Sequence, residues 1–289
     1  MNKLIFGCGY LGQRVARLWQ EEGHHVIVVT RSANKAAELQ RQGMSAVVAD
    51  IAQPATLTEL PDLATVLFAV GFDRTPGQSI LEVYEGGVRN VLAALPANTP
   101  RVTYISTTGV YGNAAGEWVD ERTPPEPRRD GGRASLAAER ALAERPLGAN
   151  SIILRLAGLY GPGRVPLVEQ IRAGEPIAAV ENGHLNLIHV EDAAAAVLSA
   201  DRLAPFADGP RIYCVSDGQP VRRDEYYREV ARQIGAPTVR FTAPAPDSPR
   251  AARAESDRRI RNDRMQKELG IKLKYPDYRA GLTAILSAL

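Results

Sequence analysis

The chain has 289 residues, enough to bury one large core or a domain and a half. Hydrophobic content of 45% and charged content of 24% are ordinary for a globular protein, and a net charge of +2 gives no reason to expect nucleic acid or a membrane surface as a partner. No apolar run approaches the roughly 20 residues of a membrane-spanning helix. Two cysteines are too few for a disulfide framework, and the first predicted strand leaves no room for a signal peptide. We therefore expect a cytoplasmic protein.

A glycine pattern opens the chain. The apolar run at residues 4–6 predicts a buried strand, and Gly7, Gly9 and Gly12 follow it at G-x-G-x-x-G spacing before an amphipathic helix. In that context Gly7 allows the tight turn, Gly9 lets the backbone approach a pyrophosphate, and Gly12 lets the helix pack on the strand. The free amides of the helix N-terminus would hold the phosphates, and we include Tyr10 and Leu11 in this turn. A glycine-rich turn that opens some other α/β unit is the alternative.

Cys8 lies inside the glycine pattern. A helix N-terminus can lower a thiol pKa, so this cysteine could be reactive. The alternative is that a small residue simply fits between two glycines.

Strands and helices alternate through the first half of the chain. Apolar runs predict strands at 25–30, 45–49, 65–70, 101–105 and 151–156, with helices between them. This alternation is typical of a parallel sheet covered on both faces. We predict a Rossmann-type doubly wound α/β sheet of about seven strands from residues 1–155, with 185–215 returning to it, and a small substrate lobe from residues 156–289.

The carboxyl ends of the predicted strands mark a site, because ligands bind at that edge of a parallel sheet. Apart from the glycine turn, the predicted site residues are Arg31, Ser32, Asp50, Ile51, Ala69, Val70 and Thr107.

Two predicted helices suggest self-association. One carries an apolar stripe from Tyr84 to Leu95, and the other has alanines at helical spacing from Ala134 to Ala141. A face of small residues invites the close approach of another helix. We predict a homodimer in which these two helices from each subunit form a four-helix contact.

Three later segments resemble the extended short-chain dehydrogenase/reductase superfamily, of the NAD-dependent epimerase/dehydratase type. They read Ser-Thr-Thr-Gly-Val-Tyr-Gly at 106–112, Leu-Arg-Leu-Ala-Gly-Leu-Tyr-Gly-Pro-Gly at 154–163 and Ile-His-Val-Glu-Asp at 188–192. The resemblance covers almost the whole chain and implies the Rossmann fold and a nicotinamide dinucleotide. It also implies that Thr107 hydrogen-bonds the reacting oxygen of a substrate.

The chain departs from that family at its catalytic pair. The family carries Tyr-x-x-x-Lys on the helix after the long loop, and the lysine lowers the tyrosine pKa so that a phenol can act as an acid or base. Aligned on Glu139, those two positions are Gly131 and Ser135. The chain therefore resembles an atypical branch without the pair. Tyr111 is the nearest phenol that could move a proton, although in the family this tyrosine usually packs near the substrate.

The end of the second strand bears on the choice of dinucleotide. An NAD site usually has Asp or Glu there to bind the ribose hydroxyls, whereas this chain has Arg31 and Ser32. A guanidinium and a hydroxyl suit a 2′-phosphate, so we expect NADP, with NAD possible. The alternative is that Arg31 is a solvated residue at a helix start. Asp50 matches the family's acidic residue beside the adenine, or else it belongs to a turn.

Two functions of different classes remain. The first is an NADP-dependent oxidoreductase or epimerase-like enzyme that acts on a small polar, sugar-nucleotide-like substrate. The second is a non-catalytic sensor or regulator that binds NADP(H) without turnover. The missing pair at Gly131 and Ser135 favours the sensor, whereas the long loop and the carboxyl-terminal lobe favour the enzyme. No cluster of residues has metal-ligand spacing, so we expect no metal.

Overall fold

The computed structural model describes residues 1–58, 60–73, 77–145, 150–206, 208–246, 248, 251 and 256–287. Contacts between residues divide the chain into two compact units. The first contains Met1–Val110, Asp130–Arg155 and Ala194–Tyr213, and the second contains Tyr111–Arg129, Leu156–Ala193 and Cys214–Leu289. The loop at 111–129 thus belongs to the second unit, and the returning segment of the first unit is shorter than the 185–215 expected from the sequence.

One seven-stranded sheet runs through the described residues, in the order β12-β7-β5-β4-β1-β2-β3. The strands are β1 (Asn2–Phe6), β2 (His25–Thr30), β3 (Ser45–Val48), β4 (Thr65–Phe68), β5 (Val102–Thr107), β7 (Ile152–Leu156) and β12 (Arg211–Val215). β1 pairs in parallel with β2 and β4, β2 with β3, and β4 with β5. This confirms the predicted Rossmann-type sheet. The chain order reverses at β1, and the Rossmann class binds its ligand at that point.

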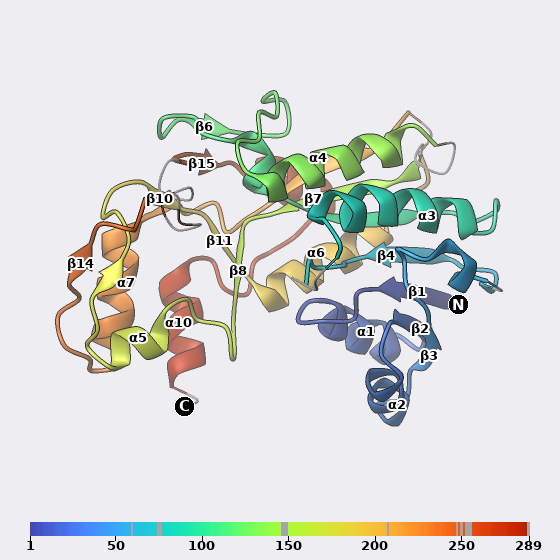
Figure 1. The fold of residues 1–289 in the computed structure, drawn as a ribbon, viewed down its shortest axis with the longest axis horizontal. Helices are drawn as coiled ribbons and strands as arrows, with labels where there is room; N and C mark the ends of the chain where they lie inside the picture. The colour runs from blue at the N-terminus through green and yellow to red at the C-terminus, as the bar shows by residue number, and fades with distance from the viewer. Residues whose placement is uncertain are drawn as a thin grey trace. The chain divides into compact units, whose positions relative to one another are not determined.

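Helices cover both faces of this sheet. They are α1 (Gly12–Glu21), α2 (Ala33–Arg41), α3 (Gly87–Ala94), α4 (Asp130–Ala143) and α6 (Val190–Asp201), with 3₁₀ turns η1 (Pro54–Thr56) and η3 (Thr108–Tyr111). A π-helical segment, η2 (Glu82–Gly86), leads into α3. Figure 1 shows α3 and α4 side by side on one side of the sheet, with α1 and α2 on the other.

The core of the first unit lies between the sheet and these helices. Val88, Val91 and Leu92 of α3 share one buried cluster with Ala138 and Ala141 of α4. The alanine stripe of α4 therefore packs inside its own subunit, where small side chains let α4 approach α3 closely. The sequence could not indicate whether the approaching helix would come from the same chain.

The second unit is built from short strands and helices. Its strands are β6 (Trp118–Val119), β8 (Gly158–Tyr160), β9 (Ile177–Ala178), β10 (His184–Leu185), β11 (Leu187–His189), β13 (Val221–Arg222), β14 (Phe241–Thr242) and β15 (Arg259–Ile260). Its helices are α5 (Val168–Arg172), α7 (Arg223–Gln233), α9 (Asp263–Leu269) and α10 (Tyr278–Leu286). Buried aromatic and aliphatic side chains of α7, α10 and β8 form its core, including Tyr160, Tyr226 and Leu282.

Two segments of the second unit differ from the sequence expectation. The strand expected near 185–189 forms as β11, but it pairs with β8 and does not join the large sheet. The long loop contains β6, which pairs with β15. A short apolar run indicates a buried strand but not its partner, because the run would be buried equally well in the large sheet or in a two-stranded one.

Candidate functional site

The turn between β1 and α1 depends on two of its glycines for packing. Gly7 has a φ of +88°, and a Cβ atom there would lie 2.5 Å from the carbonyl oxygen of Ala69. A Cβ at Gly12 would lie 2.5 Å from the carbonyl oxygen of Gly7. A Cβ at Gly9 would meet nothing within 4 Å. Gly7 and Gly12 therefore bring the helix, β1 and the end of β4 together, while Gly9 faces open space.

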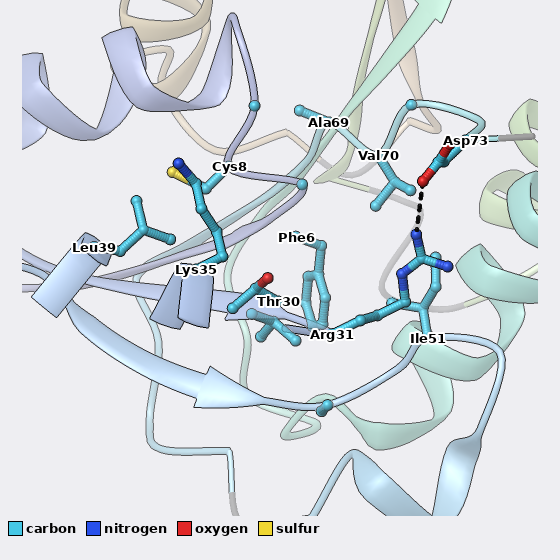
Figure 2. A pocket seen from close by; sticks show the side chains of 15 residues that line it. Phe6, Cys8, Thr30, Arg31, Lys35, Leu39, Ile51, Ala69, Val70 and Asp73 are labelled. Atoms are coloured by element: carbon cyan, nitrogen blue, oxygen red, sulfur yellow. Dashed lines mark ion pairs between the residues drawn. The ribbon is translucent and has the colours of Figure 1, made fainter. Parts of the chain in front are cut away.

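A cavity of about 460 Å³ opens beside this turn, entirely within the first unit (Figure 2). Its walls come from the carboxyl ends of β1, β2 and β4, from the start of α2, and from the segment after β3. The lining residues are Phe6, Gly7, Cys8, Gly9, Val29, Thr30, Arg31, Lys35, Leu39, Ala49, Ile51, Ala69, Val70, Gly71 and Asp73. A smaller hollow of about 50 Å³ shares part of this wall and adds Asp50, Ala52, Gln78 and Val83. This is the edge of the sheet at which a Rossmann fold binds its ligand.

Two cations line the cavity. Arg31 follows β2, and its Nη2 lies 3.6 Å from Oδ2 of Asp73, which belongs to the segment after β4. Lys35 lies in the first turn of α2, and its Nζ is 2.8 Å from Oε1 of Glu38. Figure 2 shows Lys35 beside Cys8 and Arg31 pointing toward Asp73, with Phe6 between the two cations.

Sequence reasoning had not selected Lys35, Thr30 or Asp73. Lys35 could have been found, because it stands one helical turn after Arg31 at the start of an amphipathic helix. Thr30 is the last residue of its strand, where the site was expected. Asp73 could not have been found, because it lies beyond the end of β4 in a segment without periodicity.

The predicted cofactor residues take different places. Gly7, Gly9, Arg31, Ile51, Ala69 and Val70 line the large cavity, and Asp50 lines the smaller hollow. Ser32 caps α2, because its hydroxyl accepts a hydrogen bond from the amide of Lys35 at 3.2 Å. The Tyr10 ring lies against the guanidinium of Arg14, 4.2 Å from the ring centre. Leu11 and Gly12 are buried behind the turn.

Asp50 also serves the local fold. Its Oδ1 accepts a hydrogen bond from the amide of Ala52 at 2.9 Å, which fixes the turn after β3. A role in this turn is compatible with a place beside the adenine, because Asp50 also forms part of the wall of the smaller hollow.

The thiol of Cys8 lines the cavity but is not activated. Burial raises its pKa to about 11, and the nearby Lys35 ammonium offsets only part of that rise. A thiol with this pKa is protonated at neutral pH and is a poor nucleophile. The structure therefore favours the reading of Cys8 as a small residue that fits the turn.

The two candidate catalytic residues belong to different units. Thr107 ends β5, is half-buried, and its Oγ1 accepts a hydrogen bond from the amide of Gly109 at 3.0 Å. Tyr111 belongs to the second unit, where its buried hydroxyl lies 3.1 Å from Sγ of Cys214. The phenol of Tyr111 therefore points into the core of its unit and is partnered there.

The helix α4, on which the family resemblance places the catalytic pair, contains neither tyrosine nor lysine. Gly131 lies in the first turn of α4, where a Cβ would touch only Ile80. Ser135 is buried, and its hydroxyl is hydrogen-bonded to that of Tyr104 on β5. Burial raises the pKa of Tyr104, so this phenol stays protonated.

Comparison with known proteins identifies the family. Residues 4–215 match the model of the NAD dependent epimerase/dehydratase family. The chain belongs to this family. It is thereby a member of the extended short-chain dehydrogenase/reductase superfamily, as its motifs predicted.

Several relatives resemble the chain over most of its length. Protein YeeZ of Escherichia coli strain K12 is 29% identical over 94% of this chain and 96% of its own. The 2-alkyl-3-oxoalkanoate reductase of Stenotrophomonas maltophilia is 30% identical over 81% of this chain and 75% of its own. A solved structure of a functionally unknown conserved protein from Silicibacter pomeroyi is 29% identical, with a TM-score of 0.79 over 99% of this chain and 98% of its own.

Neither a metal centre nor a membrane-spanning helix is found in the described part of the chain. No three His, Cys, Asp or Glu side chains there are grouped in a way that could hold a metal ion. None of the helices described there combines the length and apolar character that crossing a bilayer requires.

Proposed function

We propose that the protein is an NADP-dependent oxidoreductase or epimerase-like enzyme that acts on a small polar, sugar-nucleotide-like substrate. One observation carries the cofactor assignment: Arg31 and Lys35 both line the cavity beside the end of β2. NAD sites usually place a carboxylate at the end of this strand for the ribose hydroxyls. Cations in that place suit a 2′-phosphate, because a charged donor and a phosphate oxygen form strong hydrogen bonds.

The residues that line the cavity support a place for the adenosine and pyrophosphate of a dinucleotide. Open space at Gly9 and the N-terminus of α1 would receive the pyrophosphate, since the helix end presents free amides and a partial positive charge. Arg31 and Lys35 would hold the 2′-phosphate of the adenosine ribose. The apolar side chains of Ile51 and Val70 would cover the adenine beside Asp50.

The bound dinucleotide would supply or accept a hydride. We assign Thr107 to substrate binding, because it is the last residue of β5. Ligands of this fold bind at the carboxyl ends of the parallel strands. It would orient the reacting oxygen by a hydrogen bond. The name of the Stenotrophomonas relative, a reductase of an oxoalkanoate, supports hydride transfer to a carbonyl as the reaction class.

The proton donor would have to differ from the family's tyrosine. Gly131 has no side chain, and Ser135 is buried and bonded to Tyr104. Tyr111 is the remaining candidate phenol, although its hydroxyl is partnered by Cys214 in the structure. A donor from the substrate or from solvent is consistent with the same arrangement.

A titration tests the cofactor assignment. The fluorescence of NADPH and NADH changes on binding, so both dissociation constants can be measured with the same protein. We expect NADPH to bind about tenfold more tightly or better, because one charge-assisted hydrogen bond contributes about 1.5–3 kcal/mol. Equal affinities, or tighter binding of NADH, would contradict the assignment.

The second candidate is a sensor of NADP(H) without turnover. The hydrogen bond between Ser135 and Tyr104 favours it, because Ser135, at the position of the family's catalytic lysine, is buried in the core here. The two candidates separate in one assay: oxidation of NADPH in the presence of carbonyl and sugar-nucleotide substrates. Tight NADPH binding with no oxidation across that panel would favour the sensor.

We also propose a cytoplasmic homodimer. The contact would use α3, η2 and α4, whose alanine stripe is occupied inside the subunit. The outward side of this pair of helices would then form the contact, and it includes the exposed Leu81 and the half-buried Ala137.

A further inference from the structure

Arg31 and Asp73, which line the cavity from different segments, form an ion pair. Arg31 comes from the end of β2, Asp73 comes from the segment after β4, and β1 lies between these two strands in the sheet. Both residues line the large cavity and the smaller hollow. Figure 2 shows the two side chains meeting beside Val70, with Ile51 below them. The pair therefore stands where the adenosine end of a dinucleotide would lie.

The carboxylate of Asp73 and a 2′-phosphate would compete for the same guanidinium. Like charges within a few ångströms repel each other, so binding of both the phosphate and the carboxylate to Arg31 would cost free energy. The side chains of Arg31 and Asp73 are 46% and 75% exposed, so water screens the pair. Such a pair is weak enough for a phosphate dianion to displace the carboxylate.

A dinucleotide without the 2′-phosphate would meet a different site. NAD sites use a carboxylate at the end of the second strand to accept hydrogen bonds from the ribose hydroxyls. Here Arg31 follows the strand, but Asp73 brings a carboxylate to the same place from the segment after β4. The pair can stay intact while Asp73 accepts a hydroxyl.

We propose that Asp73 is a specificity-determining residue that pairs with Arg31 in the free protein, yields it to a 2′-phosphate, and accepts a ribose hydroxyl when no phosphate is present. Asp73 thereby reduces the preference for NADP over NAD. This inference rests on the proposed function, because it assigns the same cavity to a dinucleotide.

The test is the variant Asp73→Asn, which keeps the shape of the side chain and removes its charge. An exposed ion pair contributes about 0.2–1 kcal/mol, so NADPH affinity should rise by about two- to fivefold. NADH affinity should fall by a similar factor, because a neutral amide is a weaker acceptor than a carboxylate. The ratio of the two dissociation constants should therefore change by about tenfold.

Asp208→Asn is the matched control, because it removes the same charge from an exposed residue of the same unit that does not line the cavity.

A double variant tests whether Asp73 acts through Arg31. In an Arg31→Gln background no ion pair remains to be displaced, so Asp73→Asn should raise NADPH affinity less than it does in the wild type. An equal rise in both backgrounds would overturn the competition for Arg31. An unchanged ratio of affinities in Asp73→Asn would overturn the inference while leaving the proposed function standing. Failure of the wild type to bind either dinucleotide would overturn both.

Discussion

The carboxylate of Glu139 on α4 and the guanidinium of Arg155 on β7 form a buried ion pair, with Oε2 and Nη2 2.6 Å apart. Nε of Arg155 also donates to Oε1 at 3.0 Å, and that oxygen accepts a hydrogen bond from the hydroxyl of Ser106. Ser106 precedes Thr107 at the end of β5. The pair therefore fixes α4 to the end of β5, the strand that carries the candidate catalytic residue Thr107.

We predict that Arg155→Met lowers the free energy of unfolding by about 3–5 kcal/mol, because it leaves the Glu139 carboxylate buried without its counter-ion. The double variant Arg155→Met with Glu139→Gln should recover part of this loss. Chemical denaturation monitors both. The control is Arg172→Met, which breaks the exposed pair with Glu169 and should cost less than about 1 kcal/mol. Equal losses at the two positions would contradict the prediction.

Gly9 provides a test of the phosphate-binding turn. We predict that Gly9→Phe abolishes dinucleotide binding, with a loss of about a hundredfold or more, while the melting temperature changes little. A Cβ at Gly9 meets nothing in the protein, so the added ring would occupy ligand space alone. Fluorescence titration and thermal unfolding measure the two effects on one sample.

Gly12→Val is the contrasting variant. Its Cβ would lie 2.5 Å from the carbonyl oxygen of Gly7, so this change should destabilise the fold itself. If Gly9→Phe kept its affinity for NADPH and NADH, the pyrophosphate would not lie at this turn.

Arg31→Asp should shift the preference from NADP toward NAD. The substitution removes the guanidinium and places a second carboxylate opposite Asp73, so a 2′-phosphate would meet repulsion. We expect the ratio of NADPH to NADH affinity to fall by about tenfold or more, since one hydrogen bond to a charged group contributes about 1.5–3 kcal/mol. Arg41→Asp, an equal charge change at an exposed residue at the end of α2, is the control. No change in the ratio would remove Arg31 from the cofactor site.

Local patterns predicted the large sheet and its glycine turn because each strand there is a short apolar run that ends at a turn residue. β2, for example, begins and ends at the expected residues, His25 and Thr30. The sequence indicated α4 only from Ala134 onward, because Gly131 and Gly132 have low helix propensity and masked a helix that begins at Asp130.

Long-range contacts of the site were beyond sequence reasoning. The approach of Asp73 to Arg31 joins segments that follow different strands, and nothing in either segment encodes the other. The partner of the Tyr111 hydroxyl, Cys214, lies more than a hundred residues away along the chain. Such pairs follow from the topology of the fold and not from periodicity.

The second unit contains a carboxyl group whose titration should appear in the stability of the protein. Asp217 is buried, its Oδ2 has no hydrogen-bond partner among the described residues, and burial raises its pKa to about 7. The carboxylates of Asp277 and Asp192 add to this rise. Between its unfolded pKa near 4 and the folded value, the folded state binds a proton that the unfolded state does not.

The stability contributed by protonated Asp217 is therefore lost as the pH rises from about 4 to 7, by at most about 1.4 kcal/mol per pH unit. We predict that Asp217→Asn flattens this part of the stability profile and makes the variant more stable than the wild type above pH 7. Chemical denaturation across the pH range measures it. Glu175→Gln, at an exposed position of the same unit, should leave the profile unchanged. A wild-type profile that rises through this window and is unaltered by Asp217→Asn would contradict the assignment.

The homodimer is tested on the outward side of α4. Ala138 and Ala141 pack against α3 inside the subunit, so a second subunit would have to meet the exposed side of α4, which carries Arg133, Arg140 and the half-buried Ala137. We predict that sedimentation velocity shows a dimer at micromolar concentration and that Ala137→Arg produces a monomer. Arginine has nearly the helix propensity of alanine, so the melting temperature of the isolated subunit should change little. Ala173→Arg, at an exposed residue of the second unit, should leave the dimer intact. A wild-type monomer at micromolar concentration would contradict the prediction, and a dimer that persists in Ala137→Arg would place the contact on another face.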